Sequence, residues 1–265
     1  MTILDKIVEH KKQEIALAKE RVSIKELMYF RHFNQPVPSM KGALTNPSGT
    51  GIISEFKRQS PSKGIINNSA RVDVTTRDYE RAGVSALSVL TDANFFGGRN
   101  EDLTAAREAT NLPILRKDFI IDPFQVYEAK AIGASAILLI AAILTKEEAN
   151  ELGALANYLG MEVLMEIHDE SEIEKINIYV DMVGINNRNL KTFEVDLQHS
   201  VRLAQLLPAN KPKVAESGIH SVTDLLFLKA HGFNGFLIGE QFMKTDNPGR
   251  ACQQFISEIN NAINN

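Results

Sequence analysis

The stretch PILRKDFIIDPFQVYEAKAIGASAILLIAAIL, residues 113–144, contains two apolar runs separated by a segment with helical spacing. The segment begins at Asp122-Pro123 and ends at Gly133. Aspartate caps a first helical turn, proline suits the first helical position, and glycine suits a left-handed cap at the end. An apolar strand, a helix and a second apolar strand in this order are typical of a parallel sheet covered by helices.

The same alternation continues on both sides of this stretch. Segments with helical spacing lie between the apolar runs, and many begin with Asp, Asn, Ser or Thr and end at Gly. Eight strand–helix units in 265 residues predict an α/β fold, a single closed (β/α)₈ TIM barrel rather than an open sheet. No GxGxxG motif follows the first strand, which disfavours a dinucleotide-binding sheet. The predicted strands are 51–56, 86–92, 113–118, 136–142, 162–167, 182–186, 213–217 and 235–240.

We expect one domain, residues 1–265, in which residues 1–48 form an N-terminal helical extension. Residues 3–31 have helical spacing, and their apolar side chains fall on one face. We expect residues 3–31 to form one or two extra helices that pack across one end of the barrel. A connection rich in proline, glycine and serine then leads into the first strand.

The composition is that of an ordinary soluble protein, with 44% hydrophobic residues, a formal net charge of −4 and a pI near 5.9. No global basic footprint for nucleic acid is present, so an anionic ligand would need a local positive cluster. The longest apolar run, residues 136–144, is too short for a membrane helix, and the N-terminus lacks a signal-peptide core. We therefore expect a cytoplasmic protein with a small-molecule partner and no nucleic acid or membrane partner.

The cysteine and histidine pattern predicts no metal site. Cys252 is the only cysteine, so no disulfide can form within the chain, and it reads as a small helix residue. The histidines lack the spacing of metal ligands. His168 is expected to face away from Glu166 if both lie in the same strand.

Charged and amide side chains recur where the predicted strands end. In barrels of this type the active site lies at the carboxyl ends of the strands. Any one of these residues could form an ordinary ion pair, but together they predict an acid–base site with a place for an anion. They are Glu55 and Lys57 from the first strand, Lys117 from the third, Glu166 from the fifth, Asn186 and Arg188 from the sixth, Glu216 and Ser217 from the seventh, and Gly239 and Glu240 from the eighth.

The last two strands carry a second signal. The segments AESGI (215–219) and FLIGE (236–240) each place a glycine just after a strand. Barrels of this type often bind phosphate with the loops after strands seven and eight, where glycine lets the phosphate approach the backbone. We expect Lys57 or a neighbouring cation to complete this site. Phe95 and Phe96, after the second strand, either wall an aromatic substrate or simply pack.

Over about residues 50–245 the chain resembles the indole-3-glycerol phosphate synthase family of tryptophan biosynthesis. The resemblance implies a carboxy-lyase that closes an indole ring on 1-(2-carboxyphenylamino)-1-deoxyribulose 5-phosphate with loss of CO₂ and water, without cofactor or metal. The matching segments are IISEFKRQSPSKG, SVLTDANFFGG, residues 113–144, MEIHDE, GINNRNL, KVAESGI and GFLIGEQFM. The pair Gln241-Phe242 is bulkier than the family pattern at the phosphate loop.

The resemblance also implies a role for each matching residue. Lys117 takes the role of general acid in ring closure, Glu166 that of the second acid–base group, and Lys57 lies near the anionic groups of the substrate. How proton transfer is divided among these three stays open. The remaining matches are Glu55 and Asn186 as orienting residues, Ser60 and Arg188 near the anthranilate carboxylate, Glu216 as a substrate-binding residue, Leu138 and Phe96 as apolar wall, and Ser217, Gly218, Gly239 and Glu240 at the phosphate.

Three other functions are weighed against this one. Phosphoribosylanthranilate isomerase, a neighbouring barrel enzyme, uses a carboxylate and a thiol, whereas Cys252 lies beyond the eighth strand. A Schiff-base aldolase would use Lys117 as a nucleophile. A binding barrel that has lost its chemistry would lack Lys117 or Glu166, and both are present. We expect a monomer or a weak homo-oligomer.

Overall fold

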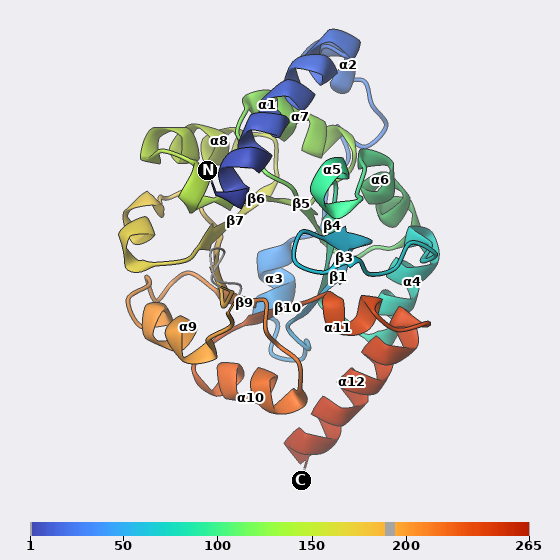
Figure 1. The fold of residues 1–265 in the computed structure, drawn as a ribbon, viewed down its shortest axis with the longest axis vertical. Helices are drawn as coiled ribbons and strands as arrows, with labels where there is room; N and C mark the ends of the chain where they lie inside the picture. The colour runs from blue at the N-terminus through green and yellow to red at the C-terminus, as the bar shows by residue number, and fades with distance from the viewer. Residues whose placement is uncertain (1, 189–193, 265) are drawn as a thin grey trace.

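The computed structural model describes residues 2–188 and 194–264, and its central feature is a closed barrel of parallel strands (Figure 1). Eight strands form the barrel, as the sequence predicts, in the order β1-β10-β9-β8-β7-β6-β5-β4. A two-stranded hairpin, β2 (Gln59–Ser60) and β3 (Gly64–Ile65), lies outside it. The barrel strands are β1 (Ile52–Phe56), β4 (Ala86–Leu90), β5 (Ile114–Lys117), β6 (Ala136–Ile140), β7 (Glu162–Ile167), β8 (Met182–Asn186), β9 (Lys213–Glu216) and β10 (Gly235–Ile238).

Helices surround the barrel and connect its strands (Figure 1). The connection from β7 to β8 differs from the predicted strand–helix unit, because it carries the 3₁₀ helix η2 (Glu170–Lys175) instead of an α-helix. Residues 168–181 leave room for little more than this short helix. The other connections contain α4 (Val72–Ala82), α5 (Ala93–Phe96), α6 (Asn100–Ala109), α7 (Pro123–Ala131), η1 (Ala141–Ile143), α8 (Lys146–Tyr158), α9 (Leu197–Ala204) and α10 (Val222–Ala230), and α11 (Glu240–Met243) and α12 (Pro248–Asn264) follow β10.

The helix boundaries confirm the local signals. Asp122 caps α7 through a reciprocal pair of hydrogen bonds with Gln125, and Pro123 is the first helical residue. The glycines that follow α7 and α8 have φ of 96° and 75°, in the left-handed region where a side chain is disfavoured. Local capping residues therefore set the start of α7 and the ends of α7 and α8.

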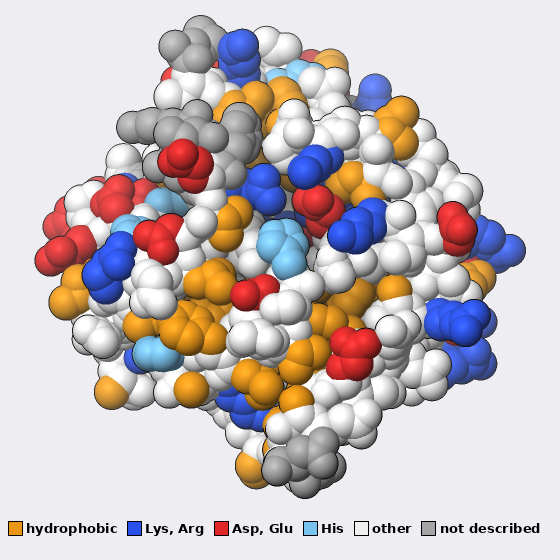
Figure 2. Space-filling model, turned by 60° about the horizontal axis from the view of Figure 1, so that its bottom comes forward, with side chains coloured by type: hydrophobic (Ala, Val, Ile, Leu, Met, Phe, Trp, Pro, Cys, Tyr) orange, Lys and Arg blue, Asp and Glu red, His pale blue; other side chains and the backbone are white. Residues whose placement is uncertain are grey.

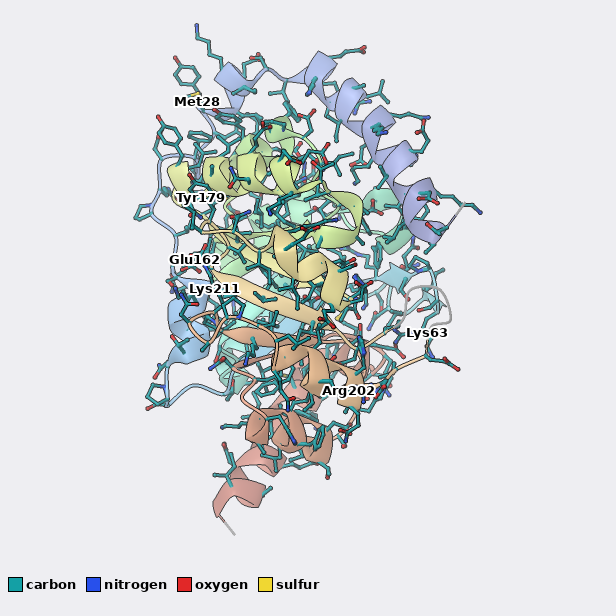
Figure 3. All side chains as sticks on the ribbon, turned by 90° about the vertical axis from the view of Figure 1, so that its left-hand side faces the viewer. Met28, Lys63, Glu162, Tyr179, Arg202 and Lys211 are labelled. Atoms are coloured by element: carbon teal, nitrogen blue, oxygen red, sulfur yellow. The ribbon has the colours of Figure 1, made fainter. Side chains whose placement is uncertain are left out.

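The N-terminal extension covers both ends of the barrel: residues 3–31 were predicted to cover one end, and residues 40–45 add cover at the other. Helices α1 (Ile3–Arg21) and α3 (Met40–Thr45) lie on opposite sides of the barrel, with α2 (Ile24–Leu27) beyond α1 (Figure 3). α3 lies at the end where the strands begin, and the backbone of Lys41 donates a hydrogen bond to Glu162, the first residue of β7. α1 lies at the end where the strands terminate.

Two layers of apolar side chains hold the barrel together. The first fills the space between strands and outer helices and includes Tyr79, Leu103 and Phe236. The second fills the barrel interior, where Met40 and Leu44 of α3 join side chains of the strands. Burial of this apolar area is the main favourable contribution to folding.

The helices of the described ranges 2–188 and 194–264 include none with both the length and the apolar character needed to cross a membrane.

Candidate active site

A cavity opens at the carboxyl ends of the barrel strands, and every site residue predicted from the sequence lines it. Side chains of both charges and a histidine gather around a recess near the middle of this face (Figure 2). The predicted residues come from all eight barrel strands and the loops after them, because parallel strands bring their carboxyl ends to one rim. The motif GINNRNL ends in Asn189 and Leu190, which lie outside the described residues.

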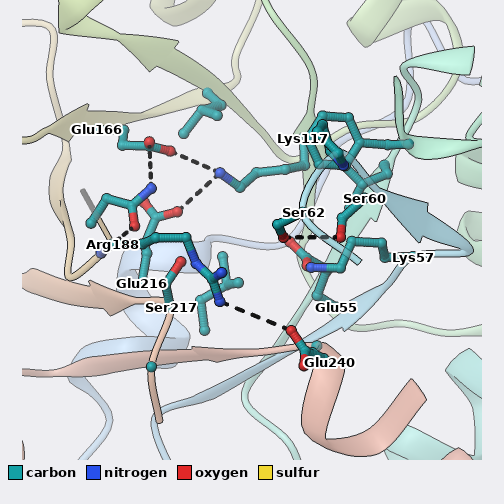
Figure 4. Close-up of a pocket in the computed structure, with 18 of the residues that line it drawn as sticks. Glu55, Lys57, Ser60, Ser62, Lys117, Glu166, Arg188, Glu216, Ser217 and Glu240 are labelled. Carbon is teal, nitrogen blue, oxygen red and sulfur yellow. Dashed lines mark hydrogen bonds and ion pairs between the residues drawn. The ribbon is translucent and has the colours of Figure 1, made fainter. Parts of the chain in front are cut away.

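Lys117 is the last residue of β5, and its side chain points into the barrel (Figure 4). Its Nζ lies 2.8 Å from Glu166 Oε2 and 3.0 Å from Glu216 Oε2. Burial alone would lower the pKa of Lys117, but the carboxylates of Glu166, Glu216 and Glu55 outweigh burial and raise the pKa above its usual value. Lys117 is therefore a fixed ammonium ion at the floor of the cavity.

Glu166 of β7 is held on both carboxylate oxygens. Lys117 binds Oε2, while Asn186 Nδ2 at the end of β8 donates to Oε1 over 2.9 Å. Burial alone would raise the pKa of Glu166, but the Lys117 ammonium and the neighbouring His168 hold it well below its usual value. Glu166 is therefore an anion in the resting site.

Glu216 of β9 differs from Glu166 although both contact Lys117. Its Oε1 is buried and has no hydrogen-bond partner in the described part of the chain. Burial raises the pKa of Glu216 to about 7; the Lys117 ammonium opposes the rise and the Glu166 carboxylate adds to it. Gly184 of β8 makes room for this carboxylate, because a Cβ there would lie 2.1 Å from Glu216 Oε1. Glu216 thus titrates near neutral pH, where a proton-transfer group is most effective.

A second ion pair lies at the end of β1. Lys57 Nζ is 2.6 Å from Glu55 Oε1, and Ser88 Oγ of β4 lies 3.5 Å from the other Glu55 oxygen. Gly239 permits this arrangement, because a Cβ there would lie 2.6 Å from Glu55 Oε1. The sequence prediction that Glu55 and Lys57 point the same way is confirmed.

The backbone after β9 has the conformation expected of an anion-binding loop. Ser217 has φ of 65°, the one positive value among the non-glycine residues described, and Gly218 follows with φ of 73°. Asn187 Nδ2 holds the loop by donating to the Ser217 carbonyl over 2.7 Å. Left-handed backbone at both residues turns the chain sharply after β9, and the absence of a side chain at Gly218 would let a phosphate approach the backbone.

Two cations stand at the rim near this loop. Arg188 Nη2 lies 3.9 Å from Glu240 Oε2, and Lys63 Nζ lies 3.6 Å from Glu240 Oε1. Both contacts are long, and each involves at least partly exposed side chains, so they are weak and give way readily to an anionic ligand.

One wall of the cavity is apolar. Leu138 and Phe96 lie there as predicted, and the Phe96 ring stacks obliquely on Phe119 with centroids 5.9 Å apart. Sequence reasoning missed Ile3 and Ile7, which α1 adds to the same wall. Their helical spacing was visible in the sequence, but nothing local indicates which end of the barrel they cover.

His168 does not lie where the sequence analysis expected it. Its Nε2 is 3.2 Å from Glu166 Oε1, so it faces Glu166 rather than away from it. Residues two positions apart share a face of an extended chain, and β7 ends only one residue before His168. The prediction that His168 faces away from Glu166 was therefore wrong, because residues two positions apart in a strand point to the same side.

A buried ion network lies behind Lys117 and joins α1 to the barrel. Lys11 of α1 is 1% exposed, and its Nζ lies 2.9 Å from Asp92, Asp118 and Glu14. Asp118 also accepts hydrogen bonds from Thr91 and from Arg116. Because Arg116 and Asp118 flank Lys117 in the chain, this network holds the strand end that carries the ammonium.

Among the described residues, no group of three or more His, Cys, Asp or Glu side chains is arranged to hold a metal ion. Cys252 is buried on α12, where burial raises the pKa of its thiol to about 12. It does not line the cavity. The cavity lining includes the ammonium groups of Lys57 and Lys117, the carboxylates of Glu55, Glu166 and Glu216, and the amide of Asn186.

Comparison with known proteins agrees with this geometry. The family model described as indole-3-glycerol phosphate synthase matches residues 4–255. The indole-3-glycerol phosphate synthase of Bacteroides thetaiotaomicron is 49% identical over 257 residues, which cover 97% of this chain and 98% of that relative. The protein of the same name from Neisseria meningitidis serogroup C is 47% identical over 251 residues, covering 92% and 95%.

Solved structures share the fold at low sequence identity. A tryptophan synthase structure from Pyrococcus furiosus has a TM-score of 0.58 and 13% identity, and covers 79% of this chain and 97% of that one. 3-Hexulose-6-phosphate synthase from Salmonella typhimurium has a TM-score of 0.61 and 11% identity, and covers 78% and 99%. These similarities establish the barrel and carry no argument about function.

Proposed function

The chain belongs to the indole-3-glycerol phosphate synthase family, and from that membership we propose that it converts 1-(2-carboxyphenylamino)-1-deoxy-D-ribulose 5-phosphate into indole-3-glycerol phosphate, CO₂ and water in tryptophan biosynthesis. The observation that supports this most is the Lys117 ammonium between Glu166 and Glu216 at the floor of the cavity. A site with one fixed acid, one fixed base and one group that titrates near neutral pH suits a reaction with several proton transfers.

The substrate has three parts, and the cavity offers each a matching region. Its aryl ring would lie against the apolar wall of Leu138, Phe96 and Ile7. Its anthranilate carboxylate would approach Arg188 and Ser60, displacing the weak contact between Arg188 and Glu240. Its phosphate would bind the loops of Ser217, Gly218, Gly239 and Glu240, with Lys57 nearby.

In the first step, the ring carbon that bears the carboxylate attacks the ketone carbon of the sugar. A carbon–carbon bond forms, the carbonyl electrons move to oxygen, and Lys117 gives that oxygen a proton. A developing alkoxide is a much stronger base than an amine, so transfer is favourable even from an ammonium with a raised pKa. Loss of CO₂ then restores the aromatic ring.

In the second part, the new hydroxyl leaves as water and a proton leaves the adjacent carbon, which forms the indole double bond. Glu166 is the base, because it is ionised and held in place by Lys117 and Asn186. Lys57 or Glu216 supplies the proton to the leaving hydroxyl, since both line the cavity. Pre-positioned charges of this kind stabilise the transition state without reorganisation.

The alternatives fit the site less well. The isomerase reaction needs a reactive thiol, whereas burial raises the pKa of Cys252 and places it outside the cavity. A Schiff-base aldolase needs a neutral lysine, whereas the carboxylates around Lys117 keep it protonated. A binding barrel without chemistry would have no use for a buried carboxyl group that titrates near neutral pH.

Four further features remain predictions: a cytoplasmic location, a monomeric or weakly associating state, and the absence of nucleic-acid and of membrane partners. The acidic composition supports the third of these, since the chain carries a net charge of −4.

The test is to add the carboxyphenylamino sugar phosphate to the purified protein and follow indole fluorescence. We expect product with the unmodified chain and almost none with Lys117→Ala, because the general acid is lost. Phosphoribosylanthranilate serves as the second substrate, and borohydride trapping tests for an imine. Turnover of phosphoribosylanthranilate alone, or a trapped adduct on Lys117, would contradict the proposal.

A further inference from the structure

His168 is a partly buried histidine that the reaction outlined above does not use. It lies behind Glu166, outside the cavity lining, and its side chain is 15% exposed. Its backbone N–H donates to Glu172 Oε2 over 2.6 Å, and its carbonyl lies 2.9 Å from Nε2 of His199 on α9. These contacts fix the residue between β7, η2 and α9.

The imidazole ring lies between two carboxylates. Nε2 is 3.2 Å from Glu166 Oε1, and Nδ1 is 3.7 Å from Glu172 Oε2. Neither ring nitrogen has a well-aligned hydrogen-bond partner in the described part of the chain, so the contact is chiefly one of charge. Burial alone would lower the pKa of His168, but the two carboxylates outweigh it and raise the pKa to about 10. The ring is therefore an imidazolium ion at neutral pH.

Around Lys117, one ammonium faces two carboxylates, and these differ in what else they contact. Glu166 Oε1 has Asn186 and His168 beside it, whereas Glu216 Oε1 has no hydrogen-bond partner in the described ranges. Two carboxylates this close to a shared ammonium compete to be the ionised one. Glu166 has a second cation, His168, beside it, so Glu166 is the carboxylate that stays ionised.

We propose that His168 is a positioning residue that keeps Glu166 ionised and so leaves the exchangeable proton of the site on Glu216. The inference rests on the proposed function, since it assigns the base and the neutral carboxyl of that same reaction. Glu172 is in turn the counter-ion that keeps His168 charged. The charged or titratable groups that face the ring from the elements packed around it are Glu166 of β7, Glu172 of η2, Asp169 at the start of η2, Lys117 of β5 beyond Glu166, and His199 of α9.

The test is the pH dependence of kcat in His168→Gln, which removes the charge but keeps an amide donor. Without the imidazolium the pKa of Glu166 rises, so the base is lost as pH falls through its new value. We expect kcat to fall about tenfold to a hundredfold at pH 6, to recover in part by pH 9, and KM to change less than about threefold. His231→Gln, the same change at an exposed helix end, is the matched control and should leave kcat unchanged.

A second variant tests the role of Glu172 independently. Glu172→Gln keeps an acceptor for the His168 backbone N–H but removes the negative charge near Nδ1. The pKa of His168 should fall, so the ring should lose its proton at a lower pH than in the unmodified chain. At pH 6 the ring is still charged, so kcat should stay near that of the unmodified chain. Imidazole ¹⁵N spectra measure this titration, with the His168 signal assigned by its loss in His168→Gln. In the unmodified chain they should show the His168 ring still protonated at pH 8.

The outcomes separate the two proposals. If the unmodified chain forms no indole product, the proposed function fails and this inference falls with it. If the chain is active and His168→Gln keeps a normal kcat from pH 6 to 9, only the inference is overturned. An equal loss at every pH would show a merely structural role and would also overturn it. Should His168→Gln fail to fold, Glu172→Gln decides by itself. An unmoved titration of the His168 ring, or a kcat that is lost at pH 6 while the ring is still protonated, overturns the inference.

Discussion

At the scale of single residues, the site depends on how five charged side chains share the floor of a barrel. Lys57 pairs with Glu55, and Lys117 pairs with Glu166 and Glu216. The carboxylates outnumber the ammonium groups by one. Because this surplus carboxylate is buried and shares Lys117 with Glu166, the pKa of Glu216 is raised.

Lys117→Ala should lower kcat by about 10²- to 10⁴-fold while the barrel stays folded, because the proton for the ketone oxygen is lost. Lys57→Ala should chiefly raise KM, since Lys57 lies where the anionic groups of the substrate are proposed to bind. Steady-state kinetics measure both. Lys229→Ala, a change at an exposed lysine in the last turn of α10 and outside the cavity lining, is the control for loss of positive charge. Near-normal turnover in Lys117→Ala would remove Lys117 from the mechanism.

Glu216→Gln should stabilise the protein at alkaline pH while it impairs catalysis. The folded-state pKa of Glu216, about 7, lies above the unfolded value, so the folded state binds the extra proton and loses this stability as pH rises toward 7. Glutamine removes that penalty, which is about 1–3 kcal/mol.

Thermal unfolding at two pH values measures the effect. At pH 5 the variant and the unmodified chain should melt at similar temperatures, because Glu216 is already neutral. At pH 8 the variant should melt about 2–10 °C higher. A variant that is less stable at pH 8 would show that Glu216 is ionised and well compensated in the fold.

At the scale of elements, α1 is the helix whose position at the barrel the sequence does not decide. Its apolar face supplies part of the cavity wall, and its one buried lysine enters the ion network beside Lys117. Burial alone would lower the pKa of Lys11, but Asp118 and Asp92 outweigh it and raise the pKa. α1 is therefore attached to the barrel by charge as well as by packing.

Lys11→Met should lower the unfolding free energy by about 3–5 kcal/mol, because it leaves Asp92 buried without its cation and Asp118 with Arg116 alone. It should also reduce kcat/KM, since Asp118 follows Lys117 in the chain. Lys12→Met, on the exposed side of the same helix, is the matched control and should change stability by less than about 0.5 kcal/mol. Equal effects of the two changes, measured by urea unfolding, would contradict the role given to Lys11.

At the scale of the whole molecule, the two ends of the barrel separate stability from catalysis. α3 places Met40 and Leu44 in the barrel interior at the end where the strands begin. The cavity lies at the other end, and neither side chain lines it. Barrels of this type generally divide the two tasks in this way.

Leu44→Ala should lower the unfolding free energy by about 2–5 kcal/mol and leave kcat/KM at 20 °C unchanged, because the lost packing lies far from the reacting groups. Leu206→Ala, at a leucine that is 51% exposed, is the control for the same deletion at the surface. Urea unfolding and initial rates measure the two quantities. A large fall in kcat/KM with intact folding would show that the bottom of the barrel is coupled to the site.

Much of the fold, and the set of residues that line the cavity, could be predicted from the sequence. The eight strands, the cap at Asp122 and the left-handed glycines after α7 and α8 act over a few residues, so they are local properties. The prediction that polar strand ends gather at one cavity is confirmed, because parallel strands in a barrel have no other arrangement. The sequence analysis missed the 3₁₀ helix η2. The short connection between β7 and β8, rather than a residue pattern, limits this segment to a short helix.

The chain alone therefore decides the order and kind of its elements and which side chains reach the rim, since periodicity, caps and strand direction are short-range. Only the folded molecule decides which end α1 covers, that His168 lies against Glu166, and which of the carboxylates beside Lys117 keeps a proton. Those outcomes depend on burial and on charges contributed by separate strands, and such long-range electrostatic sums have no signature in any single stretch of sequence.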